Sequence, residues 1–102
     1  MSTLGTELKI NVHVEPIDGL HMKDYEFECV FYVYGKNRVI LKKNEMKYVD
    51  DDNYVAIINH NNALIIGRGE IKMEFEAHVP DSDFENGFRI EKTNVCTGIT
   101  IS

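Results

Sequence analysis

Apolar and polar residues alternate along several long segments of this chain, and this period of two constrains the fold more than any other feature. From Leu8 to Val14, from Tyr25 to Val33 and from Ile71 to Val79, every second residue is apolar. Successive side chains of a β-strand point to opposite faces, so these segments predict strands with one face toward a core. No window shows a convincing apolar period of 3.6 residues, and we therefore expect little helix.

Turn residues separate about seven such segments at spacings near ten residues, which favours an all-β fold. We predict a single immunoglobulin-like β-sandwich of about seven short strands over residues 1–102, with a small β-barrel as the alternative. Residues 1–5 are expected to be a flexible N-terminal arm. Four large residues that lie in register with other apolar positions are the predicted core: Phe27, Phe31, Met73 and Phe75.

Three segments are harder to assign. The polar stretch from Lys43 to Asp52 predicts irregular structure. The asparagines after His60 predict a turn, followed by a brief strand from Leu64 to Ile66. The chain is expected to end in a strand from Phe88 to Val95 and another from Thr97 to Ile101, because Gly98 weakens a strand locally.

Charge and composition argue against several classes of protein. The chain has seventeen acidic and eleven basic residues, which gives a net charge of −6, and its longest basic cluster is Lys42-Lys43. Nucleic acids are bound by clustered Lys and Arg, so we expect no nucleic-acid partner. No basic region precedes an apolar stretch, and the longest apolar runs are short, so we expect neither a signal peptide nor a membrane span. The separated Cys29 and Cys96 fit neither a disulfide framework nor a zinc site.

No constellation of residues indicates catalysis, and we expect no enzymatic activity, no catalytic residue and no cofactor. The four histidines have no metal-ligand spacing and are interpreted as surface residues. Consecutive aspartates in the run Asp50-Asp51-Asp52 point to opposite sides of an extended chain. The sequence therefore predicts no metal site in this run.

The loop from Asp81 to Gly87 imitates the start of a calcium loop. However, Asn86 stands where such a loop needs glycine, and Lys92 where it needs a closing Glu. We interpret the loop as a wide turn whose Asx side chains cap their own backbone, with Phe84 pinning it to the core.

One apolar face has no obvious cover. Val30, Tyr32 and Tyr34 point away from Phe31 and Val33, and a monomeric sandwich would leave them in water. Aromatic residues concentrate at interfaces, so we predict that this face or the adjoining hairpin tip packs against another protein chain. The alternative is that the Lys43 to Asp52 segment covers the face. The complete candidate interface is Val30, Tyr32, Tyr34, Gly35, Lys36, Asn37 and Arg38.

Two stretches suggest a family: VPDSDFENGFRIEKTNVCTGITI at residues 79–101 and YVYGKNRVILKKNEMKYVDDDNYVAII at residues 32–58. The chain resembles small β-structured virion proteins of crAss-like tailed phages that infect gut Bacteroidales, in particular head-fibre proteins. The resemblance runs from about Leu8 to Ile101 and rests on turn and strand residues. The chain departs from the sequence pattern of this family at Asn86, where a second Asp is expected, and at Ile90, where Thr is usual.

The resemblance implies a non-catalytic head-fibre protein, attached to the capsid, that anchors or forms fibres. Its partners would be copies of itself, with a homodimer expected, and the major capsid protein or another fibre protein. It would be located in the virion, after assembly in the host cytoplasm. Two alternatives stay open: a tail or baseplate adaptor of the same phage class, and a small carbohydrate-binding β module.

Overall fold

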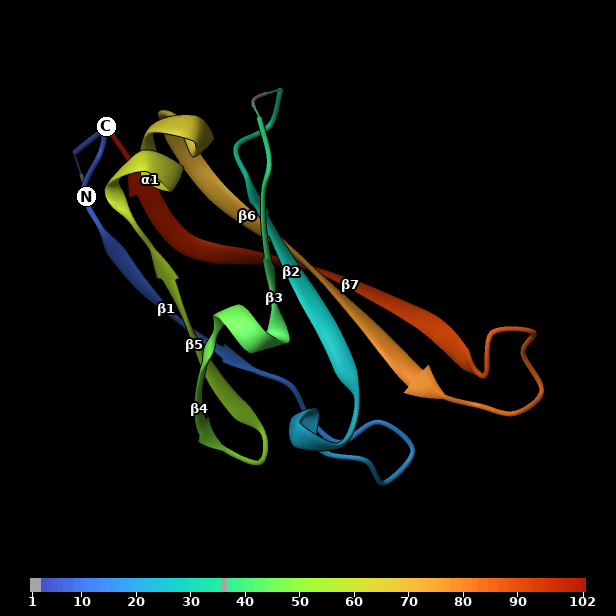
Figure 1. The fold of residues 1–102 in the computed structure, drawn as a ribbon. Coiled ribbons are helices and arrows are strands. Elements are labelled where there is room, and N and C mark those ends of the chain that lie inside the picture. The colour runs from blue at the N-terminus through green and yellow to red at the C-terminus, as the bar shows by residue number, and fades with distance from the viewer. Residues whose placement is uncertain (1–2, 36) are drawn as a thin grey trace.

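The computed structural model describes residues 3–35 and 37–102, which form two antiparallel sheets packed as a sandwich (Figure 1). One sheet has three strands, in the order β1 (Leu8–His13), β5 (Asn53–Ile58) and β4 (Lys47–Asp50). The other has four, in the order β3 (Val39–Lys42), β2 (Glu26–Tyr32), β6 (Gly69–Pro80) and β7 (Phe88–Ile101). The predicted all-β sandwich of seven strands is confirmed.

The strand order differs from that of an immunoglobulin constant domain in the position of one strand. In that domain the first, second, fifth and fourth strands share a sheet, and the third, sixth and seventh form the other. Here β2 lies between β3 and β6, so one sheet keeps three strands and the other gains a fourth. The three-stranded sheet is therefore narrower than the sheet it faces.

The core lies between the sheets and is built from alternate strand residues. Phe27, Phe31, Met73 and Phe75 are all buried, as predicted. Phe27 stands nearly perpendicular to Tyr54 of the opposite sheet, with ring centroids 5.1 Å apart, and lies the same distance from Phe75. Edge-to-face ring pairs of this kind add to the free energy gained from burial. This aromatic cluster holds the two sheets together.

A short helix, α1 (His60–Ile66), replaces the turn and the brief strand that we expected after residue 59. The Asn59 side chain caps it by accepting a hydrogen bond from the Asn62 amide at 2.8 Å, and Gly67 ends it with a positive φ of 83°. Only Ala63 and Ile66, three residues apart, are buried on the core. The prediction was wrong because β-branched residues favour strands locally, whereas the caps and this packing favour a helix.

The stretch from Lys43 to Asp52, predicted to be irregular, contains a 3-10 turn, η2 (Lys43–Glu45), followed by β4. Met46 is buried between them and anchors the crossing from one sheet to the other. All four residues of β4 are exposed. A strand with both faces in solvent has no alternation of apolar residues, which explains why the sequence pattern missed it.

The last two predicted strands are one strand, β7, which is 14 residues long. Its pairing with β6 is regular from Phe88 to Cys96 and shifts near Gly98, where φ is 78°. At the shift the Thr97 hydroxyl donates a 2.8 Å hydrogen bond to the Ile71 carbonyl oxygen. Gly98 therefore bulges the strand without ending it.

The chain ends lie close together (Figure 1). The Leu4 amide donates to a backbone oxygen of Ser102 at 3.1 Å, and the Gly5 carbonyl oxygen lies 2.8 Å from Nδ1 of His60. Residues 4 and 5 are thus attached to the sandwich. Met1 and Ser2 lie outside the described residues, and for them the flexible arm stays a prediction.

Candidate functional site

The hairpin tip between β2 and β3 is the most exposed part of the predicted interface. Tyr34 is 83% exposed, and Asn37 and Arg38 are exposed beside it. Gly35 has a positive φ of 77°, which reverses the chain at the tip. Lys36, also predicted as an interface residue, lies outside the described residues.

The base of the tip is held by two contacts. The guanidinium carbon of Arg38 lies 4.4 Å from the ring centroid of Tyr32, a cation–π contact. On the opposite face Val33 is buried against Gly69, where an added Cβ would lie 2.6 Å from Val33 Cγ1. Because both sides of the hairpin are packed at this level, Tyr34 projects from a supported base.

Val30 does not belong to the exposed face. It is only 7% exposed and lies in register between Ile40 of β3 and Glu74 of β6. Our expectation that a monomer would leave it in water was therefore wrong. Among the described residues the candidate interface reduces to Tyr32, Tyr34, Gly35, Asn37 and Arg38, which we call the hairpin-tip surface.

The alternative, in which the Lys43 to Asp52 segment covers this face, does not hold for residues 47–50. Residues 47–50 form β4, which pairs with β5 in the opposite sheet, so this part of the segment does not lie over Tyr32 and Tyr34. Instead, a hollow of about 260 Å³ opens beside them on the outer face of the sheet. It is lined by Tyr32, Tyr34, Lys72, Asn94, Val95 and Cys96.

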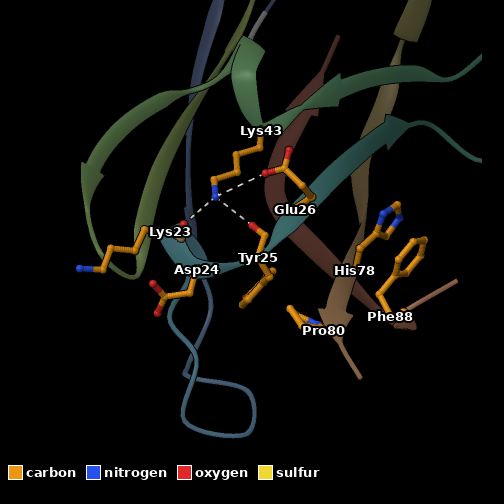
Figure 2. Close-up of a pocket in the computed structure, with 9 residues that line it drawn as sticks. Lys23, Asp24, Tyr25, Glu26, Lys43, His78, Pro80 and Phe88 are labelled. Carbon is orange, nitrogen blue, oxygen red and sulfur yellow. Dashed lines mark hydrogen bonds and ion pairs between the residues drawn. The ribbon is translucent and has the colours of Figure 1, made fainter. Parts of the chain in front are cut away.

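A second pocket, of about 350 Å³, contains Lys43, Tyr25, His78 and Phe88 (Figure 2). The Lys43 ammonium donates to the carbonyl oxygens of Lys23 at 2.8 Å and Tyr25 at 2.9 Å, and lies 3.7 Å from a Glu26 carboxylate oxygen. Through these contacts the Lys43 ammonium joins the β3–β4 connection to the β1–β2 connection.

On the other side of this pocket, His78 contacts Phe88 and Glu76. The His78 ring stacks on Phe88 with centroids 4.8 Å apart, and its Nε2 lies 3.0 Å from Oε2 of Glu76. That contact with His78 is the main cause of the lowered pKa of Glu76. The Tyr25 hydroxyl is buried and has no hydrogen-bond partner among the described residues. Burial, with Asp52 and Glu91 nearby, raises the pKa of Tyr25 to about 12.

Asp50 and Asp51, in the aspartate run at residues 50–52, accept hydrogen bonds from residues close to them in sequence. Asp50 accepts from the Asp52 amide at 3.0 Å and from the Asn53 side chain at 2.8 Å, and these bonds lower the pKa of Asp50. Asp51 accepts from the Tyr48 hydroxyl at 2.8 Å, which lowers the pKa of Asp51 in the same way. The Asp50 and Asp51 carboxylates thus stabilise the turn between β4 and β5, whereas Asp52 Oδ1 lies 2.8 Å from Nδ1 of His21.

Arg89 joins the Asp81 to Gly87 loop to the β1–β2 connection. Asp81 accepts from the Asp83 amide at 3.1 Å, the Asx turn that we predicted, and from Arg89 Nη1 at 3.1 Å. Arg89 also donates to Glu91 at 2.9 Å and to Asp18 of the β1–β2 connection. Phe84 is exposed and does not pin the loop to the core, contrary to our prediction.

Sequence reasoning missed the role of Arg89. Two of its carboxylate partners, Asp81 and Glu91, are near in sequence, but Asp18 is distant, and no motif marks this contact. In residues 3–35 and 37–102, no group of three or more His, Cys, Asp or Glu side chains is arranged to hold a metal ion. None of the helices described is both long enough and apolar enough to cross a bilayer.

A comparison of the chain with protein-family models, with curated proteins and with solved structures found no match.

Proposed function

We propose that this protein is a non-catalytic structural module that binds a second protein through the hairpin-tip surface. The observation that carries the proposal is Tyr34, 83% exposed at the end of a hairpin whose base is held by the Arg38–Tyr32 contact. Tyr and Arg are over-represented among residues that dominate binding energy at interfaces. A side chain on a supported base also loses less conformational entropy when it binds.

We further propose that the module is a virion component of a tailed phage, a head-fibre protein that binds the major capsid protein or another fibre protein. The resemblance at residues 32–58 and 79–101 supports this role. The first of these stretches contains the whole hairpin-tip surface. A sandwich with a projecting aromatic tip also suits a protein that must be rigid and attach to a neighbour.

The virion assignment is tested by mass spectrometry of purified phage particles. We expect the protein in particles from which unassembled protein has been removed by density-gradient centrifugation. Its presence in lysates and absence from such particles would overturn the assignment. Labelling with an antibody against the protein then separates a position on the head from one on the tail, where an adaptor would lie.

The role of the tip is tested by the double variant Tyr32→Ser/Tyr34→Ser, with Tyr48→Ser as the control. Tyr48 is an exposed tyrosine of the other sheet, so the control removes an aromatic ring from a different part of the surface. We expect the tip variant to lose incorporation into particles while it keeps the fold, as judged by its far-ultraviolet circular dichroism. Normal incorporation of the folded tip variant would contradict the proposal.

A further inference from the structure

The outer edge of β7 is long and open. β7 is the last strand of its sheet, and among the described strands it pairs only with β6. Every residue from Lys92 to Cys96 is exposed. A strand at the edge of a sheet presents a row of unpaired N–H and C=O groups that another strand can bind.

The other three edges carry features that discourage pairing, whereas β7 lacks them in its centre. β3 and β4 are only four residues long, and the register of β4 shifts between Tyr48 and Asp50. β1 carries Lys9 as its second residue. Short strands, irregular register and lysines all block edge-to-edge association. Residues 93–97 of β7, Thr-Asn-Val-Cys-Thr, contain no charge and no proline, and three of the five are β-branched.

Both faces of the sheet are hollow beside this stretch. On the outer face is the hollow that contains Tyr32, Tyr34 and Cys96. On the inner face a hollow of about 240 Å³ lies beside this stretch, lined in part by Met73, Phe75 and Val95. Val95 is consequently 44% exposed although it points toward the core side. A strand added beside β7 would shield this residue.

We propose that a second copy of the chain pairs with this edge, antiparallel to β7, around a two-fold axis at Thr93 or Asn94. Such a pair would join the two four-stranded sheets into one continuous sheet. A two-fold interface uses the same surface of both copies, and an open strand edge can pair with its own copy in this way. β7 itself carries two positive residues, Arg89 and Lys92, and one negative, Glu91, so the overall charge of −6 is not concentrated on this edge.

Charge selects the position of the axis. A two-fold axis perpendicular to the sheet places the residue on the axis opposite its own copy, and like charges opposite one another are destabilising. An axis at Glu91 or Lys92 would create such a pair. An axis at Asn94 instead sets Thr93 opposite the second copy's Val95, and an axis at Thr93 pairs Thr93 with itself. Both registers keep identical charges apart.

This inference goes beyond the binding role of the hairpin tip and does not depend on it. Pairing through β7 leaves Tyr34 and Arg38 free, so each dimer would present two tips. Two tips on one rigid sheet would bind a repetitive surface more tightly than one, because the second contact becomes intramolecular.

The proposal is tested by the molar mass of the purified full chain in solution, measured by light scattering after size-exclusion chromatography. We expect the wild type to be a dimer and Val95→Glu to be a monomer, because in both registers a glutamate at residue 95 lies opposite or diagonal to the second copy's Glu91. The control is Val49→Glu, the same change at an exposed valine on the β4 edge, which should remain a dimer. Circular dichroism verifies that each variant is folded. A monomeric wild type, or a Val95→Glu variant that is folded and dimeric, would overturn the proposal.

Cysteine cross-linking tests the register. Each variant also carries Cys96→Ser, which removes the exposed natural cysteine of β7. Cα atoms of directly opposed strand residues lie about 4.5–5.5 Å apart, within reach of a disulfide. We expect Thr93→Cys or Asn94→Cys to give a cross-linked dimer under mild oxidation, and Val49→Cys not to. If the Tyr32→Ser/Tyr34→Ser variant is monomeric while Val95→Glu is dimeric, the copies meet at the tip instead, and the β7 proposal fails.

Discussion

The ammonium nitrogen of Lys43 lies 2.9 Å from the carbonyl oxygen of Tyr25 and joins two connections that are distant in sequence. Lys43 begins η2, on the crossing from β3 to β4, whereas Tyr25 follows η1 (Met22–Asp24), on the connection from β1 to β2. The same ammonium binds the Lys23 carbonyl oxygen. Both connections cross between the sheets, so Lys43 fixes the positions of the two sheets at one end of the sandwich.

We predict that Lys43→Met destabilises the protein by about 1–3 kcal/mol, since hydrogen bonds to a charged group are lost and two carbonyl groups lose their donor. Methionine keeps most of the apolar stem. The free energy of unfolding is measured by urea denaturation, with Lys47→Met, at an exposed position of β4, as the control. Equal stability of the two variants would show that Lys43 does not fix the sheets.

Phe75→Ala should cost about 3–5 kcal/mol, because it removes a buried ring from the aromatic cluster and leaves a cavity. Phe84→Ala is the matched control. Its ring lies in solvent on the β6–β7 loop, so we expect almost no change. Chemical denaturation of both variants compares them directly, and similar losses would contradict the burial described above.

Tyr25→Phe should stabilise the protein by about 1 kcal/mol, because a buried hydroxyl without a partner carries a desolvation penalty that phenylalanine avoids. The variant should also tolerate alkali better. The folded pKa of Tyr25 is about 12, against an ordinary value of 10.0, so stability falls as pH rises from 10 toward 12. A clear loss of stability at neutral pH would mean that the hydroxyl has a partner after all.

Stability should also fall as pH rises above 6.5, the ordinary pKa of histidine, because of His21. Its Nδ1 lies 2.8 Å from Asp52 Oδ1, and this hydrogen bond raises the pKa of His21 above its ordinary value of 6.5. A raised folded pKa contributes stability that is complete below pH 6.5 and is lost as pH rises through the folded pKa. Contacts with Glu15 and Asn53 raise the pKa of His13 in the same direction.

The variant His21→Gln isolates this effect. Its melting temperature should decline less than that of the wild type across the same pH range, and His13→Gln/His21→Gln should decline least. Parallel curves for the wild type and both variants would show that neither histidine couples pH to folding.

The parts of the hairpin tip were predictable to different degrees. Tyr34 follows an alternating segment and precedes a glycine, so its exposure at a turn could be read locally. Val30 shares the same period, yet it is buried. Alternation assigns a residue to a face of a strand, but the residues on the neighbouring strands, here Ile40 and Glu74, determine whether that face is covered.

The sequence by itself determined the β class and which residues of the long strands face the core, because these follow from the two-residue period of an extended backbone. Only the tertiary structure decided that β2 lies between β3 and β6, that Arg89 contacts Asp18 of the β1–β2 connection, and that the centre of β7 is left uncovered. These features depend on contacts between segments far apart along the chain. Local patterning contains no information about which segments will meet.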